Sequence, residues 1–168
     1  MHLEIIHEFD IPRDALELAV ISPTLCAKLA SRLSNMEGIQ QKEHHVQGDR
    51  VERVWSYRAN IRLPDFAKAY VTPEMMAWDE RSAYDIKKHA AEWTIVPRVK
   101  PEWRKYFAAS GTYVLTELDS GRTKRTISGT VELRVPVLQQ VAEKLIVGEV
   151  RKTFDAEAET LRDLATLV

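Results

Sequence analysis

The sequence changes its apolar periodicity once, at Pro136, and this change limits the folds that the chain can adopt. From Met36 to Val135, apolar and polar residues alternate with a period of two, which is typical of strands with one buried face. Residues from about 137 to 167 contain no proline, and their apolar residues recur at helical spacing. A long block of strands followed by one long helix predicts an α+β protein in which the helix packs on an antiparallel sheet.

The first 35 residues predict one further strand and two short helices. Residues 2–9 alternate like the later strands, Pro12 suits a first helical turn, and the pair Ser22-Pro23 is a second helix start. The two helices are expected at roughly residues 12–20 and 22–33. The later strands are expected at residues 36–47, 50–61, 74–84, 87–97, 106–118 and 122–135, which gives a sheet of about seven strands.

Length and composition favour one folded domain spanning residues 1–168. Hydrophobic residues make up 45% of the chain and charged residues 29%, a composition that argues against intrinsic disorder. The net charge of −1 gives no general attraction to nucleic acid, so no nucleic-acid partner is expected. The chain has one cysteine, no signal-peptide pattern and no apolar run of the ~20 residues that a membrane span needs. A cytoplasmic protein is therefore expected.

Several short motifs resemble the START-like (SRPBCC) superfamily, whose members have the helix-grip fold. They are Trp78-Asp79, Trp93-Thr94-Ile95-Val96-Pro97, Ser110-Gly111-Thr112-Tyr113, the strand from Arg122 to Val135, and VPVLQQVAEKLI at the start of the long helix. With the order of elements, these motifs look like an uncharacterised bacterial branch of that superfamily. One departure is Gln139, because that branch commonly has Val-Pro-Leu-x-Gly before the helix and this chain has no glycine there.

The resemblance implies a curved antiparallel sheet that grips the long helix and leaves a cavity between them. Members bind lipids, sterols, polyketides or other hydrophobic molecules, and some are enzymes, so the fold alone does not decide the function. We expect an internal void on the order of several hundred Å³, which is the usual size of a ligand site. In that case Val131→Trp would block ligand uptake while costing little stability, because the new side chain would enter empty space.

The expected pocket is lined mainly by aromatic and aliphatic side chains. These are Trp55, Tyr57, Trp78, Trp93, Ile127, Val131 and Leu145. Arg53 shares a strand face with Trp55 and Tyr57, so it could orient a polar end of the ligand, or it could extend to water at the strand end. His7 shares the apolar face of the first strand, where it is either a hydrogen-bonded buried histidine or an acid–base group of the cavity.

No motif indicates a metal or another cofactor. The five histidines lack ligand spacing, and the adjacent His44 and His45 would point to opposite faces of a strand. Cys26 lies on the apolar side of a helix, where a small core residue is expected. The sequence contains neither a Gly-x-Ser-x-Gly motif nor a glycine-rich phosphate loop. The run Asp79-Glu80-Arg81 and Glu149 are expected to carry ordinary surface charges.

One connecting segment mixes basic and aromatic residues and could rest transiently on an anionic membrane surface. Its residues are Arg98, Lys100, Trp103, Arg104 and Lys105. The alternative is a solvated loop, because the neighbouring Glu102 and the near-zero net charge weaken the attraction.

The apolar stripe of the long helix changes direction near Gly148. Leu138, Val141, Ala142 and Leu145 centre on one face, while Val150, Phe154, Leu161 and Ala165 centre about a third of a turn further round. We therefore expect residues 138–146 to cover the cavity and residues 150–165 to pack permanently, with Gly148 between the two parts. A single broad apolar face on a curved sheet is the alternative.

Three functions remain open from the sequence. The first is non-catalytic binding or transport of a hydrophobic small molecule or lipid in the cavity. The second is an enzyme of the polyketide cyclase or aromatase kind, with acid–base groups in the same cavity. The third is an interaction protein whose cavity is filled by its own side chains.

Overall fold

The computed structural model describes residues 1–119, 121–135 and 139–167. The strands are β1 (His2–Phe9), β2 (Met36–Gln47), β3 (Arg50–Ala59), β4 (Ala77–Asp85), β5 (Ala90–Pro97), β6 (Phe107–Asp119) and β7 (Arg122–Leu133). The helices are α1 (Arg13–Val20), α2 (Leu25–Ala30), α3 (Asp65–Lys68) and α4 (Gln139–Ala165), with two short 3₁₀ helices, η1 (Pro73–Met76) and η2 (Pro101–Tyr106).

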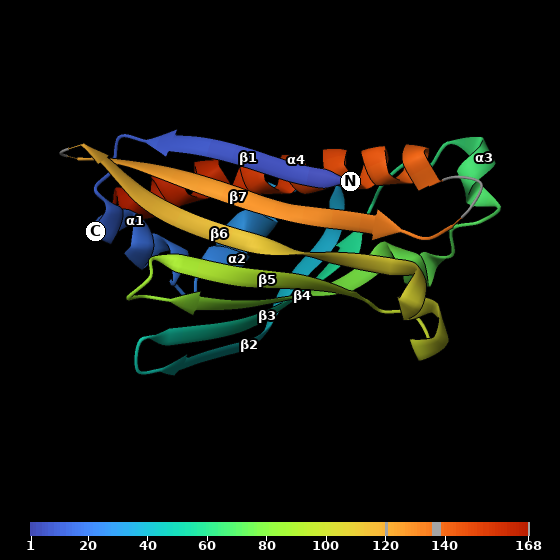
Figure 1. Cartoon of the computed structure of the whole chain (residues 1–168), viewed down its shortest axis with the longest axis horizontal. Coiled ribbons are helices and arrows are strands. Elements are labelled where there is room, and N and C mark those ends of the chain that lie inside the picture. The colour runs from blue at the N-terminus through green and yellow to red at the C-terminus, as the bar shows by residue number, and fades with distance from the viewer. Residues whose placement is uncertain (120, 136–138, 168) are drawn as a thin grey trace.

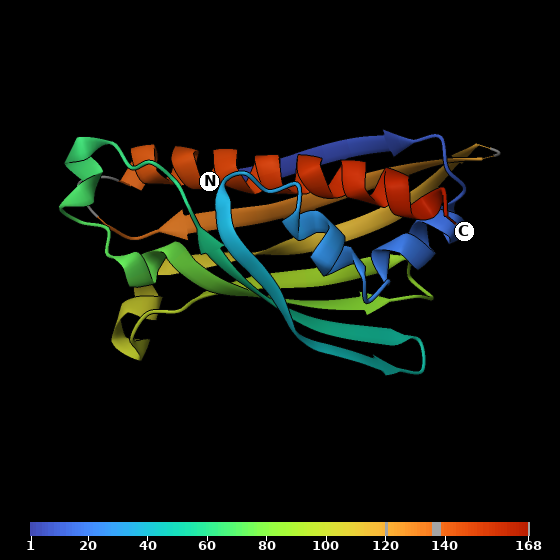
Figure 2. The ribbon, with the colours of Figure 1, turned by 180° about the vertical axis from the view of Figure 1, so that it is seen from behind.

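The seven strands form one antiparallel sheet in the order β1-β7-β6-β5-β4-β3-β2. The predicted α+β class and the order of elements are thus confirmed. The first strand pairs with the last, with Ile5 opposite Ile127, so only β1 and β2 lie at the sheet edges. The sheet curves around α4, which lies behind β1 and β7 in Figure 1 and in front of the sheet in Figure 2.

The elongated molecule has two different ends. At the hairpin end lie the β2–β3, β4–β5 and β6–β7 turns, with α1 and the C-terminal part of α4 (Figure 1). At the α3 end lie α3, η1, η2 and the start of α4, and Figure 2 shows the same grouping from behind. Gly48 and Gly121 have positive φ angles of 58° and 89° in two of the hairpin turns, a backbone conformation that glycine adopts without steric cost.

Buried side chains from several elements pack together at the hairpin end. Phe9 on β1, Leu16 on α1, Leu29 on α2 and Leu161 on α4 are all buried there. Cys26 is buried in the same cluster, and burial raises the pKa of its thiol to about 11, so it is a core residue and not a nucleophile. Of the described helices, none is both long and apolar enough to cross a bilayer.

The inner stripe of α4 is straight, which corrects the change of direction expected at Gly148. The residues that face the sheet follow helical spacing along the whole element: Glu143, Val147, Val150, Phe154, Glu157, Leu161 and Leu164. Val141 and Leu145 lie off this stripe and are 47% and 42% exposed, and Leu138 lies outside the described residues. The apolar pattern of the sequence did not reveal this stripe, because two of its positions are occupied by Glu143 and Glu157.

Candidate functional site

The concave face of the sheet presents aromatic side chains towards α4. Tyr57 on β3 pairs with Trp78 on β4, and their rings stack with centroids 5.4 Å apart and planes 9° from parallel. Trp55 and Tyr57 are buried, and Trp78 is partly buried. The structure thus brings these three of the residues expected in the pocket onto one surface.

Trp93 lies on a floor made of two glycines. Gly111 on β6 and Gly129 on β7 stand opposite each other in the sheet, next to Trp93 on β5. A Cβ atom at Gly129 would lie 2.5 Å from Cζ2 of the Trp93 indole, so only glycine leaves room for the ring. The indole Nε1 donates a hydrogen bond to the Thr112 carbonyl oxygen (3.3 Å), and Phe154 of α4 packs 6.3 Å from its ring.

A small chamber lies between the sheet and α4. Its volume is about 20 Å³, and it is lined by Val20, Arg53, Glu80, Ser82, Tyr84, Ala91, Trp93, Tyr113, Phe154 and Glu157. That space suits about one water molecule. This chamber is much smaller than the void on the order of several hundred Å³ expected from the sequence, because aromatic side chains such as Trp93, Tyr113 and Phe154 occupy the space between sheet and helix.

The chamber contains ionisable groups from both of its walls. Glu80 points inward from β4, next to Trp55 of β3 in the sheet register, and Glu157 enters from α4. Glu80 is partly buried and lines the chamber. Burial, and next the negative charge of Glu157, raise the pKa of Glu80 to about 7, while Arg53 opposes the shift. Glu80 is therefore not the surface charge that the sequence suggested.

Arg53 is buried inside the molecule and does not extend to water at the strand end. Its Nη1 donates a hydrogen bond to the Val20 carbonyl oxygen (2.7 Å), and its guanidinium lies 4.7 Å from the centroid of the Trp55 ring. Among the described residues, Arg53 Nε and Trp55 Nε1 have no hydrogen-bond partner. Arg53 lines the chamber and Trp55 packs against its guanidinium, so these two buried donors are available to an acceptor atom of a ligand.

A second buried network ties α4 to the sheet. Arg125 on β7 forms an ion pair with Glu157 (2.8 Å) and also donates a hydrogen bond to the Phe154 carbonyl oxygen (2.8 Å). Its side chain has no exposed surface, and its guanidinium lies 5.3 Å from the centroid of the Tyr113 ring. Arg125 and Glu157 were not predicted from the sequence. A usable signal for Arg125 was its position two residues from the buried Ile127, which places both side chains on the same face of β7.

His7 belongs to this network and is not among the residues that line the chamber. Arg125 Nη2 lies 3.1 Å from His7 Nδ1, and because a guanidinium can only donate, Nδ1 is the acceptor. Nε2 then carries the proton and donates to Asp155 Oδ1 at 2.8 Å. Burial, and next the charge of Arg125, lower the pKa of His7, which holds the ring neutral. Both ring nitrogens have partners, so His7 has a structural role here.

The remaining expected pocket residues differ in position. Ile127 and Val131 on β7 are fully buried in the packed core. Val131→Trp is therefore expected to destabilise the fold, in contrast to the outcome expected for an empty cavity. Leu145 is exposed, which corrects its assignment to the pocket lining.

A wider hollow of about 280 Å³ lies on the opposite face of the sheet, but it is open and lined by charged side chains such as Glu52, Arg81 and Glu92. The described residues contain no group of three or more His, Cys, Asp or Glu side chains placed to hold a metal ion.

The curved seven-stranded sheet, the two helices after β1 and the long C-terminal helix together make a helix-grip fold. The chain belongs to the family described as a protein of unknown function, DUF2505, whose model matches residues 4–164. A comparison with curated protein sequences finds no significant match.

Similar solved structures include two biosynthetic enzymes and a third protein, Ara h 8.0201. The Zhui aromatase/cyclase from Streptomyces sp. R1128 superposes with a TM-score of 0.67 at 15% identity, covering 99% of this chain and 93% of that one. Norcoclaurine synthase from Thalictrum flavum gives 0.65 at 11% identity, covering 95% and 84%. Ara h 8.0201 gives 0.58 at 14% identity, covering 96% and 97%. At these identities the likeness concerns the fold alone.

Proposed function

We propose that the chain binds a small, mainly apolar molecule between the sheet and the N-terminal half of α4, without catalysing a reaction on it. The observation that supports this most is the uneven covering of the inner apolar surface. Near the α3 end, Trp78, Ile95 and Phe107 on the sheet and Ile146 and Val147 on α4 are only partly buried. Covering such surface gains roughly 25 cal/mol per Å², so it favours an apolar occupant.

The chamber supplies the polar end of this site. Arg53 Nε and Trp55 Nε1 are buried donors without a partner among the described residues, and Glu80 can donate or accept near neutral pH. A ligand with one hydroxyl, carbonyl or carboxylate group would satisfy them, while its apolar body would lie along Trp78 and Ile146. The proposed ligand class is therefore amphipathic, such as a lipid with a small polar end or a hydroxylated ring compound.

A ligand of this kind needs more room than the chamber of about 20 Å³ provides, so α4 must shift. Polar contacts hold the N-terminal half of α4 in place, whereas the C-terminal half also has the buried ion pair between Arg125 and Glu157. Glu143 accepts hydrogen bonds from the Leu133 amide (3.1 Å) and from Gln139 (3.2 Å), and Glu149 accepts one from Asn35 (2.6 Å). Water can replace such bonds, whereas the apolar packing of Ala158 and Leu161 resists displacement.

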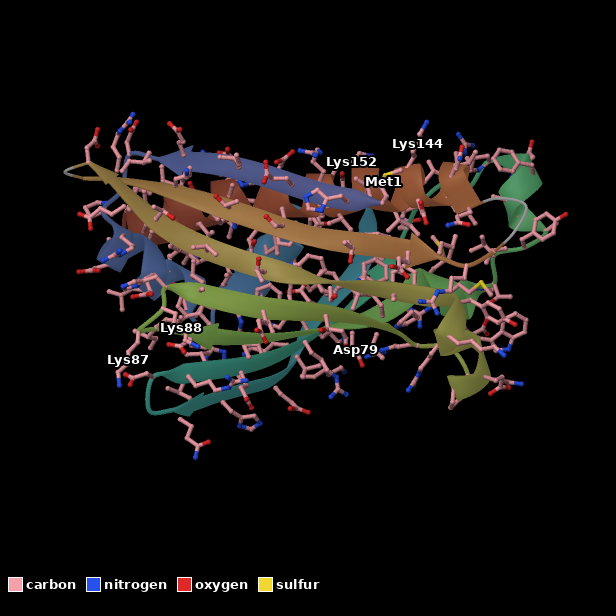
Figure 3. The ribbon with its side chains drawn as sticks, in the orientation of Figure 1. Met1, Asp79, Lys87, Lys88, Lys144 and Lys152 are labelled. Carbon is pink, nitrogen blue, oxygen red and sulfur yellow. The ribbon has the colours of Figure 1, made fainter. Side chains whose placement is uncertain are left out.

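The test uses the dye 8-anilinonaphthalene-1-sulfonate, which has an apolar ring system and an anionic group. ¹H–¹⁵N spectra of the protein contain the indole N–H signals of its four tryptophans, which report on separate places. We expect the dye to shift the Trp55 and Trp78 signals, and Ile146→Glu to weaken binding by roughly 10-fold or more, because a charge would enter the apolar site. Lys144→Glu adds a negative charge on the outer side of the same helix and serves as the matched control (Figure 3). Shifts confined to Trp103, or equal loss in both variants, would contradict the proposal.

Glu80 favours a second candidate, an acid–base enzyme of the cyclase kind. A carboxyl group with a pKa of about 7, placed in a chamber with Arg53 and Glu157, has the properties of a general acid or base. In that case Glu80→Gln, purified from the protein's own host, would retain a small molecule whose mass differs from that retained by the wild type. Identical retained masses in both proteins would support binding without catalysis.

A further inference from the structure

We propose that the α3 end of the molecule docks on the surface of an anionic lipid bilayer. The proposal concerns the outer surface and does not depend on the ligand proposed above. All four of the strongly exposed aromatic side chains among the described residues lie at this end: Phe66 and Tyr70 in and beside α3, and Trp103 and Tyr106 in η2. Aromatic rings of this kind are enriched at the interface between a membrane and water.

The aliphatic surface of the same end adds to these rings. Three aliphatic side chains are exposed there: Met75 of η1, and Val141 and Leu145 of α4, which lie outside the inner stripe of that helix. Figures 1 and 2 show α3, η2 and the start of α4 at the same end of the molecule from opposite sides. The exposed apolar residues of α4 therefore lie at the α3 end of the molecule and do not pack against the core.

The net charge of this end is opposite in sign to that of the rest of the chain. Residues 60–76, 99–106, 134–135 and 139–144 carry seven Lys and Arg against four Asp and Glu, whereas the remainder carries 17 against 21. Lys100, Arg104, Lys105 and Lys144 lie among or beside the exposed apolar residues. Arg98, in contrast, is held on the sheet by Asp79 (2.9 Å) and takes no part in the docking surface.

Basic and aromatic residues together indicate a bilayer more than a protein partner. Each Lys or Arg near an anionic membrane contributes attraction, and the rings enter the headgroup layer. A second copy of the chain would present the same positive charge and would be repelled. The proposed occupant is thus a membrane leaflet rich in anionic lipid.

The test is sedimentation with vesicles made of phosphatidylcholine alone, or of equal parts of phosphatidylcholine and phosphatidylserine. We expect binding to the mixed vesicles only, weakened by salt. Arg104→Glu with Lys105→Glu should lower the affinity by more than ~10-fold. Lys87→Glu with Lys88→Glu makes the same charge change at the hairpin end and should leave binding nearly unchanged (Figure 3). Equal loss in both double variants would overturn the proposed location.

A second measurement uses the wild-type chain and is independent of variant folding. Trp103 is half exposed, whereas Trp55 and Trp93 are buried, so acrylamide should quench Trp103 first. Mixed vesicles should protect this fluorescence and phosphatidylcholine vesicles should not. No binding to mixed vesicles at low salt, or unprotected Trp103 in the bound state, would overturn the proposal. A concentration-dependent dimer whose formation buries Trp103 in the absence of vesicles would also overturn it in favour of self-association.

Discussion

Glu80 makes stability depend on pH in an unusual direction. Its pKa is about 7 in the folded protein against an ordinary value of 4.5, so the folded chain binds more protons than the unfolded chain in that interval. The contribution of Glu80 to folding stability therefore falls as the pH rises from about 4.5 to 7. Most surface carboxylates that gain a partner on folding have the opposite effect.

Glu80→Gln should remove this loss, because glutamine stays neutral. Urea unfolding should show the variant more stable than the wild type at pH 8 by roughly 1–3 kcal/mol, and similar to it at pH 5. Glu37→Gln, at an exposed position on β2, is the control and should show no such dependence. A difference between Glu80→Gln and wild type that is the same at both pH values would contradict the assignment.

Gly129 is required by the ring that lies on it. Gly129→Ala should destabilise the fold by roughly 1–3 kcal/mol, because the new methyl would lie 2.5 Å from Trp93 and 2.7 Å from the Ser110 carbonyl oxygen. Gly38→Ala is the matched strand control, since a Cβ there meets nothing within 4 Å. Thermal unfolding of both variants measures the difference, and equal melting temperatures would show that Trp93 can move at no cost.

At the scale of elements, Gly148 separates two differently held parts of α4. A methyl at this position would meet nothing within 4 Å, so Gly148→Ala should raise stability by up to about 1 kcal/mol through helix propensity. Amide hydrogen exchange should show weaker protection in residues 139–147 than in residues 150–165. Equal protection on both sides, with dye exchange unchanged in the alanine variant, would leave Gly148 without a role in ligand entry.

The helices and strands were predictable from the sequence, whereas the side chains that fill the interior were predictable only in part. Alternation and turn motifs specify strands, because both depend on neighbours along the chain. The buried ion pair between Arg125 and Glu157 depends on a contact across 32 positions, and charged residues in isolation favour the surface. The same expectation, that charged residues lie on the surface, placed Glu80 outside. It also left two glutamates out of the predicted inner stripe of α4, so that the predicted stripe changed direction.

At the scale of the whole molecule, the two ends of the long axis differ both in how the interior is packed and in which side chains are exposed. The hairpin end is closed by α1, α2 and the C-terminal half of α4. The α3 end combines a partly covered inner surface with exposed aromatic and basic side chains. If both proposals hold, a ligand would enter at the end that meets the membrane, although each proposal is tested by itself.

The central claim is that the interior between the sheet and α4 holds a small amphipathic molecule. Native mass spectrometry of the protein purified from its own host tests this most directly, followed by denaturation and extraction. We expect a defined mass excess that is lost on denaturation, with release of one class of amphipathic molecule, and its absence in Ile146→Glu but not in Lys144→Glu. A wild-type protein that carries no excess mass, and that binds none of the lipids extracted from its host, would contradict the claim.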